Sequence, residues 1–172
     1  MSASGVADNK REGIKMNLKQ SLIENDSIKL NQYADTWQQA IKIGTDLLVA
    51  SGAVEPRYYE AIISSINELG PYIILAPGLA MPHARPEDGV NKTAFALVTL
   101  TEPVVFEGED TPVDVFLTLA GSTSDQHMQG LMEITQVLDD EHSETGVDLA
   151  KIKACNSKEE IYQVIDDALN KA

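Results

Sequence analysis

The chain contains one cysteine, Cys155, in 172 residues. One cysteine excludes an internal disulfide framework and favours a reducing compartment, so we expect a cytoplasmic protein. No apolar run approaches the roughly 18 residues that a membrane-spanning helix needs. The start of the chain also lacks the charged-then-apolar pattern of a signal peptide. We therefore expect no direct membrane insertion.

Basic residues are scarce, because 13 lysines and arginines stand against 27 aspartates and glutamates, giving a formal net charge of −14. Without a local basic patch, such a chain does not bind the phosphates of nucleic acid, and that class of partner is excluded. Acidic surfaces mostly serve solubility, and this one can also attract a basic partner protein.

The composition, with 43% hydrophobic and 23% charged residues, is typical of a globular protein. Residues 1–15 are small, polar and without periodicity, which predicts a disordered tail or an expression remnant, with Met16 as a candidate natural start. Residues 16–172 are long enough for one domain with a full hydrophobic core.

Apolar spacing predicts helices on either side of a group of strands. The expected helices cover 35–50, 56–69, 125–140 and 157–170, after a short amphipathic turn at 18–23, and the expected strands cover 72–76, 93–100 and 113–120. The last strand alternates as if it were buried on one main face. This order indicates an α/β fold with a mixed sheet.

Capping residues or an apolar stripe refine each of these four helices. We expect Asp35 to cap the first helix, Ser124 or Asp125 to cap the third, and Ser157 to cap the last. The second helix should bury one stripe, formed by Tyr59, Ile62, Ile63, Ile66 and Leu69.

His83 lies in a stretch, 77–86, that is crowded with glycine and proline. Pro82 and Pro86 each favour an extended backbone in the preceding residue. If the segment is extended, His83 and Arg85 point to the same side. An imidazole beside a guanidinium is a candidate anion site, because arginine binds phosphate oxygens in a bidentate way. The alternative is a loop histidine near a surface arginine.

His127 follows a predicted strand end and a small polar loop, and it falls in the first turn of the next expected helix. Backbone N–H groups at a helix start favour anions, so a phosphate there would meet donors and an imidazole together. The alternative is an exposed first-turn histidine. His142, in an acidic stretch, receives no role.

Other chemistries have weak support. The two candidate histidines lack the close paired spacing of zinc ligands, so no metal is expected. Motifs for a serine nucleophile elbow, a phosphate-binding loop or a dinucleotide site are absent, so no cofactor is expected. A small metal-dependent hydrolase that uses His83 and His127 stays open as an alternative.

Residues 78–85, Gly-Leu-Ala-Met-Pro-His-Ala-Arg, resemble the active-site signature of the mannitol/fructose-type enzyme IIA components. These proteins belong to the bacterial phosphoenolpyruvate-dependent sugar phosphotransferase system. The resemblance runs from about Leu18 to Leu169, and Ser124–His127 matches the place of the second active-site histidine. The run Gly70–Gly78 is most similar to the ascorbate-specific members.

The resemblance implies a mixed sheet flanked by helices on both faces and a phosphoryl-carrier function. His83 would accept phosphate from the phosphocarrier HPr, with its other ring nitrogen held by a carbonyl. His127 would stabilise the phosphoryl group, and Arg85 is a lesser candidate for charge stabilisation. The acceptor would be the cysteine of an ascorbate-type enzyme IIB, which serves a membrane enzyme IIC. A regulatory, nitrogen-type relative is the alternative.

One departure concerns the helix before the signature. Mannitol-type members carry an arginine there that helps at the active site, whereas residues 65–69 contain none. Either Asn67 stands in its place with a reduced role, or Arg85 or another group supplies the charge. Cys155 has no histidine or basic cluster that would support a phosphocysteine, so the cysteine-dependent step is expected on another chain.

Overall fold

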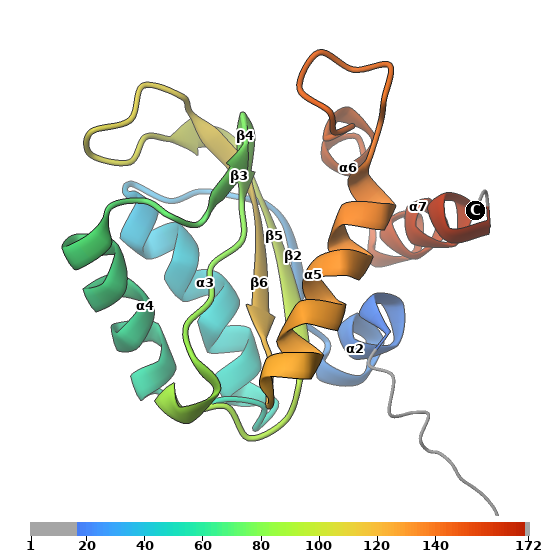
Figure 1. Cartoon of the computed structure of the whole chain (residues 1–172). Helices are drawn as coiled ribbons and strands as arrows, with labels where there is room; N and C mark the ends of the chain where they lie inside the picture. The colour runs from blue at the N-terminus through green and yellow to red at the C-terminus, as the bar shows by residue number, and fades with distance from the viewer. Residues whose placement is uncertain (1–16, 171–172) are drawn as a thin grey trace, which may run out of the picture.

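The computed structural model describes residues 17–170, so the expected tail over 1–15 lies outside the described residues. Helices and strands follow one another along the chain as Figure 1 shows, and their bounds are α2 Leu18–Asn25, β2 Ile28–Gln32, α3 Trp37–Ala50, α4 Arg57–Leu69, β3 Ile74–Ala76, β4 Gly78–Ala80, the 3-10 turn η1 Pro86–Asp88, β5 Ala94–Val104, β6 Val113–Ala120, α5 Ser124–Leu138, α6 Ala150–Lys153 and α7 Lys158–Asn170.

The five strands form one sheet in the order β2-β5-β6-β4-β3. The β2–β5 and β4–β6 pairs are parallel, whereas β5–β6 and β3–β4 are antiparallel. The long central hairpin sets the register, with Phe95 opposite Leu119 and Leu97 opposite Leu117. The predicted mixed sheet is therefore confirmed.

Helices cover both faces of the sheet, as predicted. On one face α3 and α4 pack against the strands through a core that includes Ile41, Tyr58 and Phe116. On the other face α2, α5 and α7 pack through a second core that includes Phe95 and Ile161. Because β6 lies between these two layers, nearly all of its residues are buried, and the expectation of one buried face is wrong.

Two strands, β2 and β4, were not predicted. β2 is a five-residue strand at an edge of the sheet, and β4 begins at Gly78 within the glycine- and proline-rich stretch. Each is a strand because it pairs with a distant one, β2 with β5 and β4 with β6. β4 is also the element that leads directly into His83.

The first two long helices differ from prediction in detail. Thr36, one residue after Asp35, caps α3, because its side-chain oxygen accepts a first-turn N–H. In α4 the buried aromatic residue is Tyr58, which shares a stripe with Ile62 and Ile66, while Tyr59 is half-buried beside Lys42. Leu69 at the end of α4 is 70% exposed, so its predicted burial is wrong.

Candidate functional site

The imidazole of His83 is held through one of its two nitrogens. Nδ1 lies 2.7 Å from the carbonyl oxygen of Met81. A carbonyl only accepts hydrogen bonds, so Nδ1 carries the proton in the neutral ring and Nε2 carries the lone pair. The carbonyl contact expected from the sequence is therefore present, and Nε2 is the ring nitrogen with an available lone pair.

The backbone leading into His83 is anchored to β6 and to the residue that precedes β3. The Met81 N–H donates to the Ile73 carbonyl at 2.8 Å. The Pro82 carbonyl accepts the Leu119 N–H of β6 at 3.0 Å. Because these bonds connect the segment to the sheet on both sides, its position is as fixed as that of the strands, although it is not itself a strand.

Two tyrosine hydroxyls anchor the backbone at and after His83. Tyr72 donates to the His83 carbonyl at 2.6 Å. Tyr58 accepts the Ala84 N–H at 2.9 Å and donates to the Leu119 carbonyl at 3.0 Å. Sequence reasoning missed both residues, because their partners lie far along the chain: the predicted stripe of the second helix contains Tyr59 in place of Tyr58, and Tyr72 is only part of an expected strand.

His127 lies in the first turn of α5, as predicted, but the cap is Thr123 and not Ser124 or Asp125. Thr123 has an extended backbone, and its side-chain oxygen accepts the Gln126 N–H at 3.1 Å. This cap fixes the direction in which α5 leaves the end of β6.

Gly121 allows α5 to begin close to the end of β6. A Cβ atom added at Gly121 would lie 2.7 Å from both Cα and Cβ of His127. No other residue fits that approach without a shift of the helix start. Nearby, the Ser122 N–H donates to the Thr93 hydroxyl at 3.0 Å, which links the loop to the residue preceding β5.

The sheet brings the two histidines together. The ring centroids of His83 and His127 are 4.9 Å apart, with planes tilted by 55°. The edge of the Tyr72 ring also meets the His83 ring, with centroids 5.2 Å apart and planes at 87°. A group bound at Nε2 of His83 would therefore have a second imidazole within reach.

Both imidazoles favour the uncharged form. Burial lowers the pKa of His83 from its ordinary value, and the hydrogen bond with Met81 acts in the opposite direction. Burial also lowers the pKa of His127, and the nearby charge of His83 lowers it further. At neutral pH the pair therefore offers a lone pair and an N–H donor without a proton having to be removed first.

Arg85 lies close in sequence to His83, but its guanidinium is paired elsewhere. Nε and Nη2 lie 3.3 Å from the two carboxylate oxygens of Asp88, and Nη1 lies 3.9 Å from Glu87. The side chain is 73% exposed. The 3-10 turn η1 places both carboxylates next to Arg85, so the proposed role of this charge at the phosphoryl group stays a prediction.

The segment that lacks the helix arginine contributes two polar side chains in this part of the fold. Asn67 lines a hollow with Trp37 and Phe106, and neither His83 nor His127 belongs to that hollow. Ser65 lies beside the Tyr72 phenol: burial raises the pKa of Tyr72, and the Ser65 hydroxyl acts in the opposite direction. This segment therefore approaches the His83 region only through the surroundings of Tyr72.

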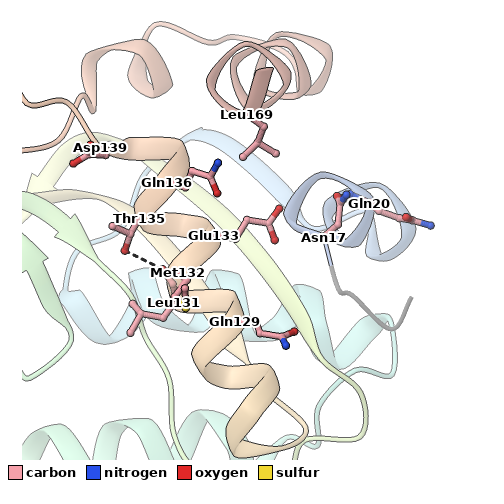
Figure 2. A pocket seen from close by; sticks show the side chains of 10 residues that line it. All are labelled: Asn17, Gln20, Gln129, Leu131, Met132, Glu133, Thr135, Gln136, Asp139 and Leu169. Carbon is pink, nitrogen blue, oxygen red and sulfur yellow. Dashed lines mark hydrogen bonds between the residues drawn. The ribbon is translucent and has the colours of Figure 1, made fainter. Parts of the chain in front are cut away.

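A large hollow lies away from the histidines, between α2, α5 and α7 (Figure 2). Its lining includes Gln129, Met132, Gln136 and Leu169, and neither His83 nor His127 belongs to it. The Glu133 carboxylate accepts the Leu18 N–H at 2.9 Å and joins α5 to the start of α2. The hollow is thus a groove between packed helices.

Two further features bear on the alternatives. Within residues 17–170, no three histidine, cysteine, aspartate or glutamate side chains form a cluster that could hold a metal ion. Over the same range, no helix is both long and apolar enough to cross a membrane. Cys155 is 4% exposed, and burial raises the pKa of its thiol, so this thiol is a poor nucleophile.

Comparison with known proteins gives the family. The sequence model described as "Phosphoenolpyruvate-dependent sugar phosphotransferase system, EIIA 2" matches residues 21–168. The chain belongs to this enzyme IIA family. It is 49% identical over 153 residues to the ascorbate-specific PTS system EIIA component of Shigella boydii, which covers 88% of this chain and 96% of that protein. The resemblance to the ascorbate-specific branch is thereby confirmed.

Solved enzyme IIA structures share the fold. A crystal structure of a PTS IIA protein from Streptococcus mutans has a TM-score of 0.83 and 42% identity, covering 90% of this chain and 96% of that one. The mannitol enzyme IIA of Escherichia coli, solved in complex with phosphorylated enzyme IIB, has a TM-score of 0.69 and 28% identity, covering 83% and 95%. Membership in this family disfavours the alternative of a small metal-dependent hydrolase.

Proposed function

We propose that this enzyme IIA is the phosphoryl carrier of an ascorbate-uptake system, and that residues 16–172 form its carrier domain. It accepts a phosphoryl group from HPr on Nε2 of His83 and passes it to the cysteine of an enzyme IIB. The observation that carries the proposal is the 2.7 Å contact between Nδ1 of His83 and the Met81 carbonyl. This contact leaves Nε2 as the nucleophile beside His127.

In the transfer step, the Nε2 lone pair of His83 forms a bond to phosphorus while the bond between phosphorus and the donor's histidine breaks. The phosphorylated imidazole then carries a positive charge. The Met81 carbonyl stabilises this charge by accepting the hydrogen bond from the proton on Nδ1. No metal or cofactor is required, because positioning and charge stabilisation carry the chemistry.

His127 contributes a hydrogen bond to the phosphoryl oxygens. Its ring centroid lies 4.9 Å from that of His83, a separation that allows an N–H to reach a group on Nε2. Arg85 is a second candidate donor if its guanidinium leaves Asp88, and Arg85→Ala tests that role directly. Full transfer activity in Arg85→Ala would show that this charge is not used.

The downstream partner carries the acceptor cysteine. Cys155 of this chain is buried, so the acceptor thiol is on another protein. The mannitol relative was solved with phosphorylated enzyme IIB, and the relative from Shigella boydii is named ascorbate-specific. We therefore assign an ascorbate-type enzyme IIB as partner and, through it, a membrane enzyme IIC, with the carrier itself in the cytoplasm.

The test is phosphorylation with phosphoenolpyruvate, enzyme I and HPr. The wild-type protein should acquire an acid-labile, base-stable phosphate, and His83→Gln should acquire none. His127→Ala should fold normally and still be labelled, at a rate lower by about 10²–10³, the usual loss for one transition-state donor. His142 is exposed, so His142→Ala is the matched control and should be labelled as wild type is. Labelling of His83→Gln at the wild-type rate would disprove the assignment.

A further inference from the structure

Tyr72 contacts His83 at two places. Its hydroxyl donates to the His83 carbonyl at 2.6 Å, and the edge of its ring meets the imidazole with centroids 5.2 Å apart. The first contact fixes the backbone at His83, and the second restricts rotation of the side chain. One planar phenol therefore constrains both the place and the direction of the imidazole.

The phenol is itself held in place. The Tyr72 N–H donates to the Gly70 carbonyl at 2.7 Å, and Pro71 between them restricts the backbone. Burial raises the pKa of Tyr72, so its hydroxyl stays protonated and able to donate at neutral pH. The neighbouring Ser65 hydroxyl acts on this pKa in the opposite direction. Tyr72 is thus a support whose backbone is restrained by Pro71 and whose hydroxyl is held by the His83 carbonyl.

His83 needs such a support, because its bond to Met81 does not fix the ring alone. One hydrogen bond at Nδ1 selects the tautomer, but the ring can still tilt about that bond. In-line attack on phosphorus requires the Nε2 lone pair to point at the donor within a narrow range of angles. The Tyr72 ring supplies the second point of contact that removes the tilt.

We propose that Tyr72 is a positioning residue for phosphoryl transfer, holding the imidazole of His83 so that Nδ1 stays on the Met81 carbonyl and Nε2 stays available to the donor. The proposal rests on the assignment of His83 as phosphoryl acceptor.

The experiment uses the full chain with two substitutions. Tyr72→Phe removes the hydrogen bond to the carbonyl and keeps the ring contact, whereas Tyr72→Leu removes both. Tyr59→Phe is the matched control, because Tyr59 is a tyrosine of α4 that lies beside Lys42. Ring-nitrogen NMR reports the tautomer of His83 in the unphosphorylated protein, and rapid-mixing kinetics report transfer from phosphorylated HPr.

We expect wild type and Tyr59→Phe to show one tautomer, with the proton on Nδ1. Tyr72→Leu should show a mixture of tautomers and transfer slower by about a hundredfold. Tyr72→Phe should be slower by about tenfold, which corresponds to the loss of one hydrogen bond. A purely structural role would lower stability and leave the tautomer of the folded fraction unchanged.

The proposal is overturned if the His83 ring signals are the same in wild type and in every folded Tyr72 variant. If Tyr72→Leu does not fold, as judged by circular dichroism, Tyr72→Phe decides by its rate and its ring signals. Failure of the proposed function is a separate result, in which wild type carries no phosphate on His83. In that case the NMR comparison still tests whether Tyr72 fixes the orientation and tautomer of the His83 ring.

Discussion

Gly121 and His127 approach each other so closely that any side chain at Gly121 would meet the backbone of His127. A Cβ there would lie 2.7 Å from Cα of His127 and 2.8 Å from its nitrogen. Backbone atoms cannot rotate away as the end of a flexible side chain does. The absence of a side chain at Gly121 therefore allows His127 to lie where it does relative to the sheet, and the geometry of the site depends on this glycine.

Gly121→Ala should push the start of α5 away from β6 and separate His127 from His83. We expect a loss of about 1–3 kcal/mol in the free energy of unfolding, as for other overpacked sites, together with slower phosphoryl transfer. Denaturant unfolding and rapid-mixing kinetics measure the two effects.

Gly108→Ala is the control for that variant. Gly108 has a positive φ of 84° with nothing near its missing side chain. It should lose about 1–2 kcal/mol through backbone strain and keep the wild-type transfer rate. Equal transfer rates in the two variants would show that the Gly121 contact does not position His127.

The cap of α5 offers a second matched pair. Thr123 and Thr36 each accept a first-turn N–H, at 3.1 Å in α5 and 3.2 Å in α3. Replacing either by alanine should cost about 1 kcal/mol of stability. Only Thr123→Ala should also slow phosphoryl transfer, because only α5 carries His127 in its first turn. A loss of transfer rate in both variants would point to a general stability effect.

The pH dependence follows from burial of the two imidazoles. The pKa of His83 and that of His127 are lowered in the folded protein, so between those values and about 6.5 the unfolded chain binds more protons. Stability should therefore rise with pH through this window and fall as the pH drops through it. Urea unfolding from pH 5 to 8 measures the slope.

The variant His83→Gln should reduce that slope, and His83→Gln combined with His127→Gln should reduce it further. The rate of phosphoryl acceptance should also fall on acidification, because protonation removes the Nε2 lone pair of His83. A wild-type slope in the double variant would mean that other groups cause the pH dependence.

The long helices α3, α4, α5 and α7 and three of the strands could be predicted from local patterns, because apolar spacing and punctuation by glycine and proline are properties of neighbouring residues, whereas the short helix α6 was not predicted. β2 and β4 could not, since β2 pairs with the distant strand β5 and β4 lies between β3 and the distant strand β6. The caps of α3 and α5 were each misplaced by one residue or more, because several adjacent residues could accept the same N–H and only the backbone decides.

The candidate site, like the fold, could be predicted from the sequence only in part. The signature and the first-turn position marked His83 and His127 as candidates. Their 4.9 Å separation depends on the strand order, which local spacing does not encode. Tyr58 falls outside the predicted stripe and Tyr72 is only part of an expected strand, yet the hydroxyl groups of both bond backbone atoms of other segments. A local sequence pattern does not reveal a hydrogen-bond partner that lies far away along the chain.

The choice of downstream partner gives the last prediction. The relative from Shigella boydii, which is 49% identical, is ascorbate-specific by name, whereas the mannitol enzyme IIA is 28% identical. Discrimination among enzyme IIB acceptors depends on contacts around the phosphoryl site, because the transfer from histidine to a cysteine thiol is the same reaction for each acceptor. We therefore expect the phosphorylated protein to transfer to an ascorbate-type enzyme IIB at least tenfold faster than to mannitol or fructose types, a preference that corresponds to about 1.4 kcal/mol.

The assay offers the phosphorylated protein to purified ascorbate, fructose and mannitol IIB domains in turn, and follows loss of phosphate from His83. Each acceptor is repeated with its cysteine changed to serine, which separates transfer to the thiol from hydrolysis. With a net charge of −14, encounter with a basic acceptor should also slow as salt rises, whereas the ranking among acceptors should persist because it depends on contacts within the interface. Transfer to a mannitol or fructose IIB, with none to the ascorbate type, would defeat the specificity assignment and leave the carrier function of His83 intact.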